Sequence, residues 1–137
     1  MYSGHCLCGG IRFRIAGQLG PIQVCHCGQC RKAQGAAFAT NSPVPVAAFE
    51  LLSGAELLAS FESSPGKQRV FCRTCGSPIY SLKDSLPGVL RIRLGLLNEA
   101  LDVQPVAHFY TGSKANWWSI TDDLPQFEAA YVAPDKP

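Results

Sequence analysis

The 137-residue sequence lacks a long hydrophobic run, a dense cluster of charge and the composition of a disordered chain. Only 16% of its residues are charged and 47% are hydrophobic, which fits a folded domain. The formal net charge is +2, and the 12 Lys and Arg residues are scattered, so no patch for a nucleic acid is visible. No segment is long enough to span a bilayer, and the first residues do not resemble a signal peptide. We therefore expect a cytoplasmic protein with no nucleic-acid or membrane partner.

Long helical segments are also missing from the sequence. No long window holds a helical period free of glycine and proline, of which there are 13 and 10. Short segments such as residues 11–15 alternate apolar and polar side chains instead. The length fits a single domain over residues 1–137 with one hydrophobic core. The sequence therefore predicts a mainly β domain with about eight to ten short strands.

Glycine and proline bound most of the expected strands and extended segments. These segments cover residues 11–15, 21–24, 36–40, 49–52, 57–62, 67–71, 78–83 and 89–97. Residues 63–66 are expected to form a hairpin turn whose second arm delivers Cys72, and residues 30–34 could form a helical turn. Pro43 and Pro45 are expected to interrupt the chain. The alternation in residues 90–95 predicts a sheet with one face in the core.

The residues that carry chemistry are the seven cysteines. They form one Cys-x-Cys pair, one Cys-x-Cys-x-x-Cys triplet and one Cys-x-x-Cys pair, at Cys6, Cys8, Cys25, Cys27, Cys30, Cys72 and Cys75. An intracellular chain keeps its thiols reduced, and an odd number cannot all form disulfides within the chain. The pattern therefore favours metal binding. No paired catalytic carboxylates, phosphate-binding glycine loop or Ser/His/Asp order competes with it.

The two cysteine pairs can complete one closed zinc site. Cys6 and Cys8 precede the first expected strand, and Cys72 and Cys75 lie at the end of a hairpin. Gly76 follows the second pair and lets the backbone turn tightly, so that amide groups point at the sulfurs. Four thiolates around zinc form a tetrahedral site with a structural role. The pairs therefore predict a zinc site that ties the N-terminal strand to the middle of the chain.

Subtracting these four leaves Cys25, Cys27 and Cys30 with no eighth cysteine to complete the set. Three thiolates on zinc leave one position for water or a substrate. Because three anionic sulfurs donate strongly, such a zinc is poorly suited to making hydroxide and better suited to another soft ligand, such as a substrate thiolate. The triplet therefore predicts a catalytic zinc site for thiol chemistry.

Other assignments stay open at the level of the sequence. His5, His26 or His108 could provide a fourth ligand and close the second site. Some cysteines of the triplet could instead pair with Cys72 and Cys75. The second zinc could also be absent, which would leave the triplet prone to oxidation. If both zincs are structural, the chain is a zinc-ribbon-like binding module without catalysis.

Four residues outside the cysteines are candidates for substrate binding. Arg31 follows the triplet and could bind a carboxylate, although a basic residue on a loop is more often solvated. Lys114 with Trp117 suits a pocket wall with a charged tip, although tryptophan more often packs in a core. His108, on an expected strand, is by residue type the best proton donor or acceptor, although a buried histidine is more often structural. Residues 121–125 are expected to form a capped turn without chemistry.

Motifs spread over essentially the whole chain carry a family resemblance. They are Gly4-His5-Cys6-Leu7-Cys8-Gly9, Cys25-His26-Cys27-Gly28-Gln29-Cys30-Arg31-Lys32, Phe71-Cys72-Arg73-Thr74-Cys75-Gly76-Ser77 and Gly112-Ser113-Lys114-Ala115-Asn116-Trp117. In this order they resemble the glutathione-dependent formaldehyde-activating enzyme family, also called the centromere protein V family. The resemblance implies a β-tent zinc-binding fold, with a structural zinc on the two cysteine pairs and a catalytic zinc on the triplet.

The resemblance also implies an activity. Members of the family join formaldehyde to the thiol of glutathione, and are classed as carbon-sulfur lyases of the S-(hydroxymethyl)glutathione synthase type. The expected cofactor is therefore two zinc ions, and the expected partners are a small-molecule thiol and a small aldehyde.

Overall fold

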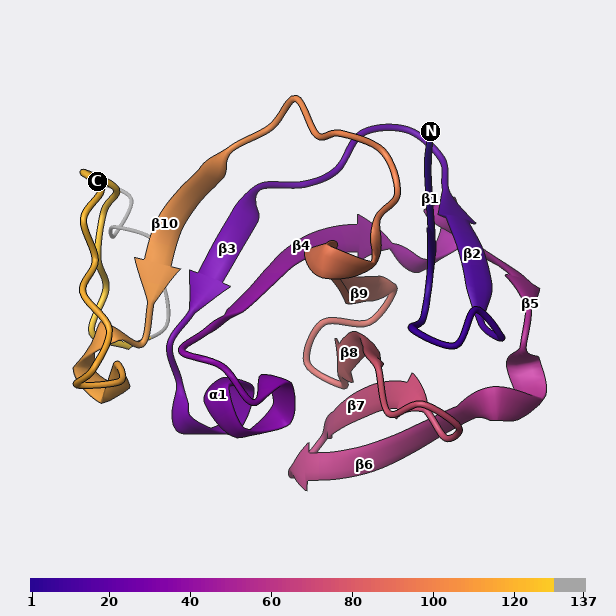
Figure 1. Cartoon of the computed structure of the whole chain (residues 1–137), viewed down its shortest axis with the longest axis horizontal. Helices are drawn as coiled ribbons and strands as arrows, with labels where there is room; N and C mark the ends of the chain where they lie inside the picture. The colour runs from indigo at the N-terminus through magenta and orange to yellow at the C-terminus, as the bar shows by residue number, and fades with distance from the viewer. Residues whose placement is uncertain (130–137) are drawn as a thin grey trace.

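The computed structural model of the protein describes residues 1–129. In this range the chain forms ten short strands and one α-helix (Figure 1). The strands are β1 (Tyr2–His5), β2 (Arg12–Ile15), β3 (Ile22–Cys25), β4 (Ala39–Pro45), β5 (Phe49–Ser53), β6 (Leu58–Ser64), β7 (Lys67–Cys72), β8 (Pro78–Lys83), β9 (Val89–Arg93) and β10 (Pro105–Phe109). The helix α1 covers Gly28–Gln34. The predicted mainly β class with eight to ten strands is confirmed.

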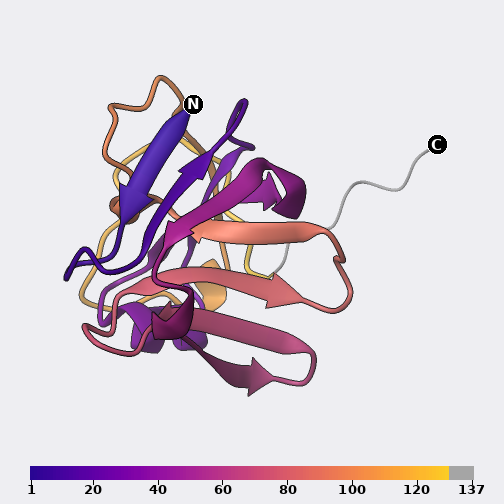
Figure 2. The same cartoon turned by 90° about the vertical axis from the view of Figure 1, so that its right-hand side faces the viewer.

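The strands form two sheets. The small sheet has the order β1-β2-β5, and the large sheet has the order β10-β3-β4-β9-β8-β7-β6. Figure 2 shows the indigo strands of the small sheet lying beside the strands of the large sheet. The large sheet is antiparallel except for β10 and β3, which run parallel with Phe109 opposite Cys25. This parallel pair sets the end of β10 beside the loop that follows Cys25.

The hydrophobic core lies where the small sheet packs against one face of the large sheet. Phe13 and Ile15 of β2 meet Val44 of β4, Ile79 of β8 and Ile92 of β9, and all five side chains are fully buried. Burial of each such side chain contributes about 1.5–3 kcal/mol relative to leaving it exposed. Because side chains alternate along a strand, the intervening residues of β4 and β9 point to the opposite face of the large sheet, and Ser81 of β8, which pairs with Arg91, shares that face beyond the register shift near Ile79.

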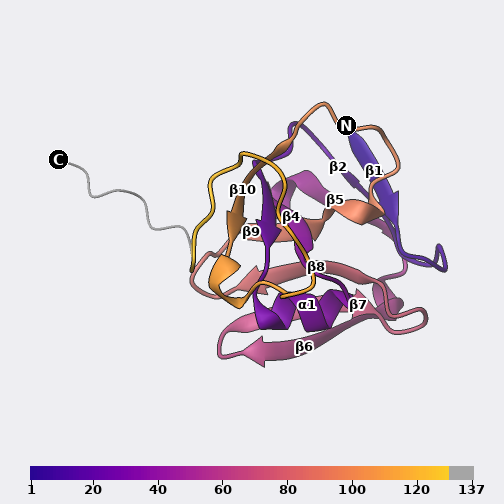
Figure 3. The same cartoon turned by 60° about the vertical axis from the view of Figure 1, so that its left-hand side comes forward.

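That opposite face is partly covered by α1. The helix lies next to β6 (Figures 1 and 3), and Gln29 Nε2 donates a hydrogen bond of 3.1 Å to the backbone oxygen of Ser63. Its first turn follows directly from the end of β3 through Cys27, which caps the helix. Among the described residues, no helix combines the length and hydropathy that crossing a bilayer requires.

Two expectations about the strands are wrong. Pro43 and Pro45 do not interrupt the chain but lie inside β4. They are tolerated there because β3 pairs only with residues 39–41, so beyond Asn41 one edge of β4 has no described strand to receive an N–H. The strand expected over residues 89–97 ends at Arg93, where a 3-10 turn around Gly95 follows, because glycine gives a strand little support.

Candidate functional site

The structure gathers the seven cysteines into a group of four and a group of three. Cys6, Cys8, Cys72 and Cys75 form the first group, and within each group all sulfur atoms lie within 4.8 Å of one another. The Sγ atoms of Cys6 and Cys8 are 3.5 Å apart, and those of Cys8 and Cys72 are 3.8 Å apart. Sulfurs bound tetrahedrally to zinc at about 2.3 Å are separated by about 3.8 Å. The first group therefore fits a four-thiolate zinc ion.

The group of four joins the two sheets. Cys6 follows β1 of the small sheet, and Cys72 ends β7 of the large sheet. Gly9 and Gly76 adopt φ values of 76° and 79°, a left-handed conformation that lets the chain turn directly after each cysteine pair. The amide of Leu7 donates to Ser77 Oγ at 2.9 Å, and the amide of Ile11 donates to Cys6 Sγ at 3.3 Å. The two loops are thus held together by hydrogen bonds around the sulfurs.

The group of three lies between β3 and α1. Cys25 ends β3, Cys27 caps α1 and Cys30 lies in its first turn, where its amide donates to Cys27 Sγ at 3.2 Å. In the described residues no histidine nitrogen or carboxylate joins these sulfurs. His26, between two of the cysteines, is fully buried and turns its ring toward His108 instead. The three thiols therefore have the donor chemistry to bind a soft metal ion and leave one of its four coordination positions open.

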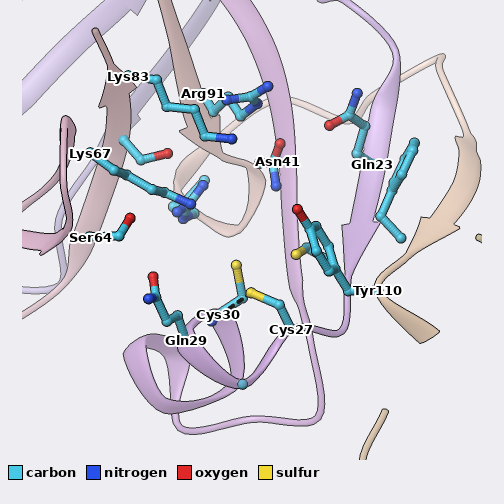
Figure 4. Close-up of a pocket in the computed structure, with 15 residues that line it drawn as sticks. Gln23, Cys27, Gln29, Cys30, Asn41, Ser64, Lys67, Lys83, Arg91 and Tyr110 are labelled. Atoms are coloured by element: carbon cyan, nitrogen blue, oxygen red, sulfur yellow. Dashed lines mark hydrogen bonds between the residues drawn. The ribbon is translucent and has the colours of Figure 1, made fainter. Parts of the chain in front are cut away.

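The sulfurs of this second group open into a cavity of about 690 Å³, which we call the thiol cavity. The described residues that line it are Gln23, Cys25, Cys27, Gly28, Gln29, Cys30, Asn41, Ser64, Lys67, Ser81, Lys83, Arg91, Arg93, Phe109 and Tyr110. Figure 4 shows the sulfurs of Cys27 and Cys30 on one side, with Lys67 and Lys83 reaching in from the opposite side. A cavity of this size accommodates a small-molecule ligand.

The sheet register explains why so many polar side chains face the thiol cavity. Lys67 pairs with Lys83, Ser81 with Arg91, Asn41 with Arg93 and Gln23 with Asn41. Paired residues lie on the same face of a sheet. Each of these residues therefore belongs to the face opposite the hydrophobic core.

The thiol cavity is strongly cationic. Four cations, Lys67, Lys83, Arg91 and Arg93, line it, and none of its described lining residues is acidic. Burial lowers the pKa of both lysines, and the nearby guanidinium groups lower it further. Three polar atoms of lining residues are buried without a described hydrogen-bond partner: Asn41 Oδ1, Ser81 Oγ and Arg93 Nη1. Unpaired buried polar groups are costly, so these atoms favour a polar ligand, and the four cations favour one that carries negative charge.

Arg69 contacts the group of three through Cys30. Its guanidinium is buried, and its Nη1 and Nη2 atoms donate to Cys30 Sγ at 3.9 and 3.8 Å. The same side chain donates from Nε to Ser63 Oγ at 3.0 Å. Hydrogen bonds from Cys25 and Cys27, together with the positive charge of Arg69, hold the pKa of Cys30 far below its ordinary value of 9.0. These surroundings therefore favour the thiolate form of Cys30.

A chain of hydrogen bonds through two buried histidines supports the Cys25-Cys27 loop from its other side. His26 Nε2 lies 2.8 Å from His108 Nδ1, and His108 Nε2 lies 3.0 Å from Asp122 Oδ2. Because a carboxylate only accepts, His108 donates from Nε2 to Asp122, and its Nδ1 then accepts from His26. The sequence predicts residues 121–125 as a capped turn, and Asp122 Oδ1 does accept from the Leu124 amide at 3.0 Å. The contact between Asp122 and His108 is not predicted, because it spans separate segments.

The family of the chain follows from comparison with known proteins. The family described as glutathione-dependent formaldehyde-activating enzyme matches residues 1–113. The chain belongs to the glutathione-dependent formaldehyde-activating enzyme family. Because the match includes all seven cysteines, this member carries both cysteine groups within the family region.

Relatives of this family member include three fungal proteins. A protein of Emericella nidulans, provisionally named glutathione-dependent formaldehyde-activating enzyme, is 24% identical over 116 residues, which cover 85% of this chain and 54% of that protein. An uncharacterized lyase of Schizosaccharomyces pombe is 29% identical over 79 residues, or 58% of this chain and 56% of the lyase. A protein of Phaeosphaeria nodorum with the same provisional name is 28% identical over 76 residues, or 56% of this chain and 40% of that protein. The chain thus spans about half the length of these relatives.

One solved structure shares the fold of this family member. It is the crystal structure of a Rhodobacter sphaeroides protein that is 22% identical, with a TM-score of 0.61, covering 73% of this chain and 91% of that protein. This likeness extends to the fold alone.

The four predicted substrate-binding residues lie outside the described lining of the thiol cavity. Arg31 is on α1, and Lys114 Nζ donates to the backbone oxygens of Ala115 and Trp118. Trp117 is exposed, and His108 is buried with both ring nitrogens engaged. Their role as substrate contacts stays a prediction for this family member, while the cations of β7, β8 and β9 are the charged groups that meet the cavity.

Proposed function

We propose that this chain joins a small aldehyde of the formaldehyde class to the thiol of an anionic peptide of the glutathione class. The proposal rests above all on one observation. The three sulfurs of Cys25, Cys27 and Cys30 open into a cavity lined by four cations and by unpaired buried polar groups. Family membership and the names of the relatives support the same chemistry.

We propose zinc as the ion for both cysteine groups, with a structural role at the group of four and a catalytic role at the group of three. A zinc ion held by Cys25, Cys27 and Cys30 would supply one more coordination position, which lowers the pKa of an incoming thiol. The soft, anionic sulfur donors favour thiol chemistry over water activation. Arg69 offsets part of the negative charge that three thiolates place in a buried site.

The cations of the cavity bind and orient the thiol substrate in this proposal. A tripeptide such as glutathione carries two carboxylates at a distance from its thiol. Lys67 and Lys83 face each other on β7 and β8, a like-charge pair whose repulsion a carboxylate would relieve. Arg91 and Arg93 offer forked donors that match a second carboxylate. Fixing both ends of the ligand positions its sulfur at the cysteine group and reduces the entropic barrier to reaction.

The reaction balances without an oxidant or reductant. The thiol gives its proton to solvent, and its sulfur forms a bond with the aldehyde carbon. The C=O π electrons become an oxyanion that takes up one proton, giving a hemithioacetal. Cleavage of the same carbon-sulfur bond is the reverse reaction, which is why the activity belongs to the carbon-sulfur lyases.

The test is the rate of exchange between glutathione and its formaldehyde adduct, measured by NMR magnetisation transfer with zinc-loaded protein. We expect acceleration over the spontaneous reaction, and loss of that acceleration in Cys27→Ser. A thiol without carboxylates, such as 2-mercaptoethanol, should be a much poorer substrate. A zinc-loaded protein that accelerates neither reaction would refute the proposal.

A second measurement separates the enzyme from a binding module with two structural zincs. An open three-thiolate ion should be lost to a mild chelator well before the four-thiolate ion, and glutathione should perturb the cobalt(II) spectrum of the open site. Simultaneous loss of both ions, with no spectral response to glutathione, would favour the binding module.

A further inference from the structure

Tyr110 has a backbone conformation that is rare for its residue type. Its φ is 58° and its ψ is 39°, and it is the one non-glycine residue with positive φ in residues 1–129. This left-handed region is unfavourable for a bulky L-residue. Strain of this kind persists where surrounding structure enforces it, and such residues gather at functional sites.

The conformation of Tyr110 has a clear effect on where its side chain points. Tyr110 directly follows Phe109, the last residue of β10, which pairs with Cys25. Successive side chains of a regular strand point to opposite faces, so the two residues would not normally share a cavity. Both nevertheless line the thiol cavity. The left-handed turn therefore brings the Tyr110 side chain onto the same side as Phe109.

The hydroxyl of Tyr110 is free to meet a ligand. Figure 4 shows the ring extending from its backbone into the thiol cavity, with the oxygen on the side of Asn41. In the described part of the chain, no group forms a hydrogen bond with this hydroxyl, whereas the backbone oxygen of Tyr110 accepts from the amide of Ser113 at 3.1 Å. The backbone is thus fixed while the phenol tip stays available.

We propose that Tyr110 is the catalytic acid that protonates the oxyanion formed when the thiolate adds to the aldehyde. The sulfur-carbon bond forms, the C=O π electrons become the oxyanion, and the Tyr110 O–H proton passes to that oxygen. The resulting phenolate regains a proton from water. An alkoxide is much more basic than a phenolate, so this proton transfer is downhill. The inference rests on the proposed function.

The other polar groups near the thiol cavity suit this role less well. His108 is buried and uses both ring nitrogens, one for His26 and one for Asp122. Lys67 and Lys83 approach from the opposite side of the cavity, where they suit the carboxylates of the thiol substrate (Figure 4). Tyr110 follows β10 and brings a hydroxyl donor into the cavity that the three cysteines also line.

The test compares Tyr110→Phe with the wild-type protein in the glutathione and formaldehyde exchange assay. Removing one acid or oxyanion donor lowers kcat by about 10²-fold in typical enzymes, and we expect that loss here. Zinc content, melting temperature and the affinity for glutathione alone should not change. Tyr110→His, which restores a donor and tolerates positive φ, should recover part of kcat. Tyr80→Phe, whose ring packs on Phe49 at 5.4 Å between centroids, is the matched control and should behave as wild type.

The outcomes separate this inference from the function on which it rests. If the wild-type protein accelerates exchange and Tyr110→Phe keeps its rate, the role of Tyr110 is refuted and the proposed function stands. If Tyr110→Phe instead loses glutathione affinity or zinc at unchanged kcat, Tyr110 is a binding or structural residue and the inference is also overturned. If the wild-type protein shows no acceleration, the proposed function itself fails.

Discussion

Arg69 provides the sharpest test of how the protein prepares its three thiols for a metal ion. Arg69 is 9% exposed, and its nearest guanidinium nitrogen lies 3.8 Å from Cys30 Sγ. In an environment of effective dielectric constant 20, two unit charges at about 4 Å interact by about 4 kcal/mol. This attraction favours the thiolate over the thiol, and it is removed in Arg69→Met.

The expected loss of zinc affinity has an upper bound set by protonation. Hydrogen bonds from Cys25 and Cys27 still lower the pKa of Cys30 in the variant, so the upper bound is the case in which that pKa returns fully to its ordinary value of 9.0 and the thiol must first lose a proton. At pH 7 that step costs about 2.7 kcal/mol, or two pH units at about 1.36 kcal/mol each, which is about 100-fold in affinity. We expect Arg69→Met to weaken zinc binding at the group of three by about 10- to 100-fold at pH 7. The weakening should shrink as the pH rises to 9, because the free thiol then ionises unaided.

Competition with a chromophoric chelator at pH 7 and pH 9 measures this effect, and cobalt(II) spectra report each thiolate site. Arg73→Met is the matched control, because Arg73 lies beside the group of four but donates to the Leu58 backbone oxygen at 3.2 Å. It should leave both sites unchanged. Equal zinc affinity of Arg69→Met and wild type at pH 7 would show that Arg69 does not prepare Cys30.

Three further predictions concern the core, the cations and the buried histidine chain. Gly4→Ala would place its Cβ 2.4 Å from Phe13 Cζ, so it should lower the free energy of unfolding by about 1–3 kcal/mol in urea denaturation. The lowered pKa values of Lys67 and Lys83 mean that both lysines lose their charge at a lower pH than ordinary lysines, whose pKa is 10.5. As the pH is raised, calorimetry should therefore show glutathione affinity decreasing before pH 10.5 is reached. Contact with His108 lowers the pKa of Asp122 from 3.8, so its stabilising effect is complete above pH 3.8 and is lost as the pH falls through the lowered value. Asp122→Asn should therefore reduce the melting temperature at neutral pH, with a difference that disappears in acid.

Each of these predictions has a neighbouring control. In Gly95→Ala the new Cβ would have no described heavy atom within 4 Å, so this variant should not destabilise the fold. Lys32→Met removes an exposed cation outside the thiol cavity and should not change glutathione binding. Asp123→Asn removes the adjacent carboxylate, and a melting temperature as low as that of Asp122→Asn would argue against a specific contact with His108.

The sequence predicts the strands best where their alternation and their turns agree. Residues 78–83 form β8 with the predicted bounds, and the hairpin around residues 63–66 is present. The strand β1 is not predicted, because Tyr2–His5 is short, contains a glycine and depends on pairing with β2. The prediction that Pro43 and Pro45 interrupt the chain fails because it also ignores the neighbouring strands. The tolerance of these prolines depends on which neighbouring strand is present, and this is a property of the sheet rather than of the segment.

The site divides in the same way. Cysteine spacing predicts the groups of four and three, because metal ligands recur at short intervals within each loop. The cationic lining is not predicted, because its members come from separate strands and meet only through the register. A local signal does exist, since Lys67 and Arg69, and likewise Arg91 and Arg93, are two residues apart and so share one face of a strand. Reading those pairs as one surface requires the order of the strands.

The parallel pairing of β10 with β3 also sets the timing of site assembly during synthesis. Phe109 emerges 84 residues after Cys25, which is 109 minus 25. At about 5–20 residues per second, the ribosome leaves the cysteine loop without its final neighbour for about 4–17 s. During that interval the three thiols lack β10, the histidine of that strand and Tyr110. The thiols of this loop are therefore open to oxidation in the nascent chain until β10 is in place, and an early metal ion would protect them.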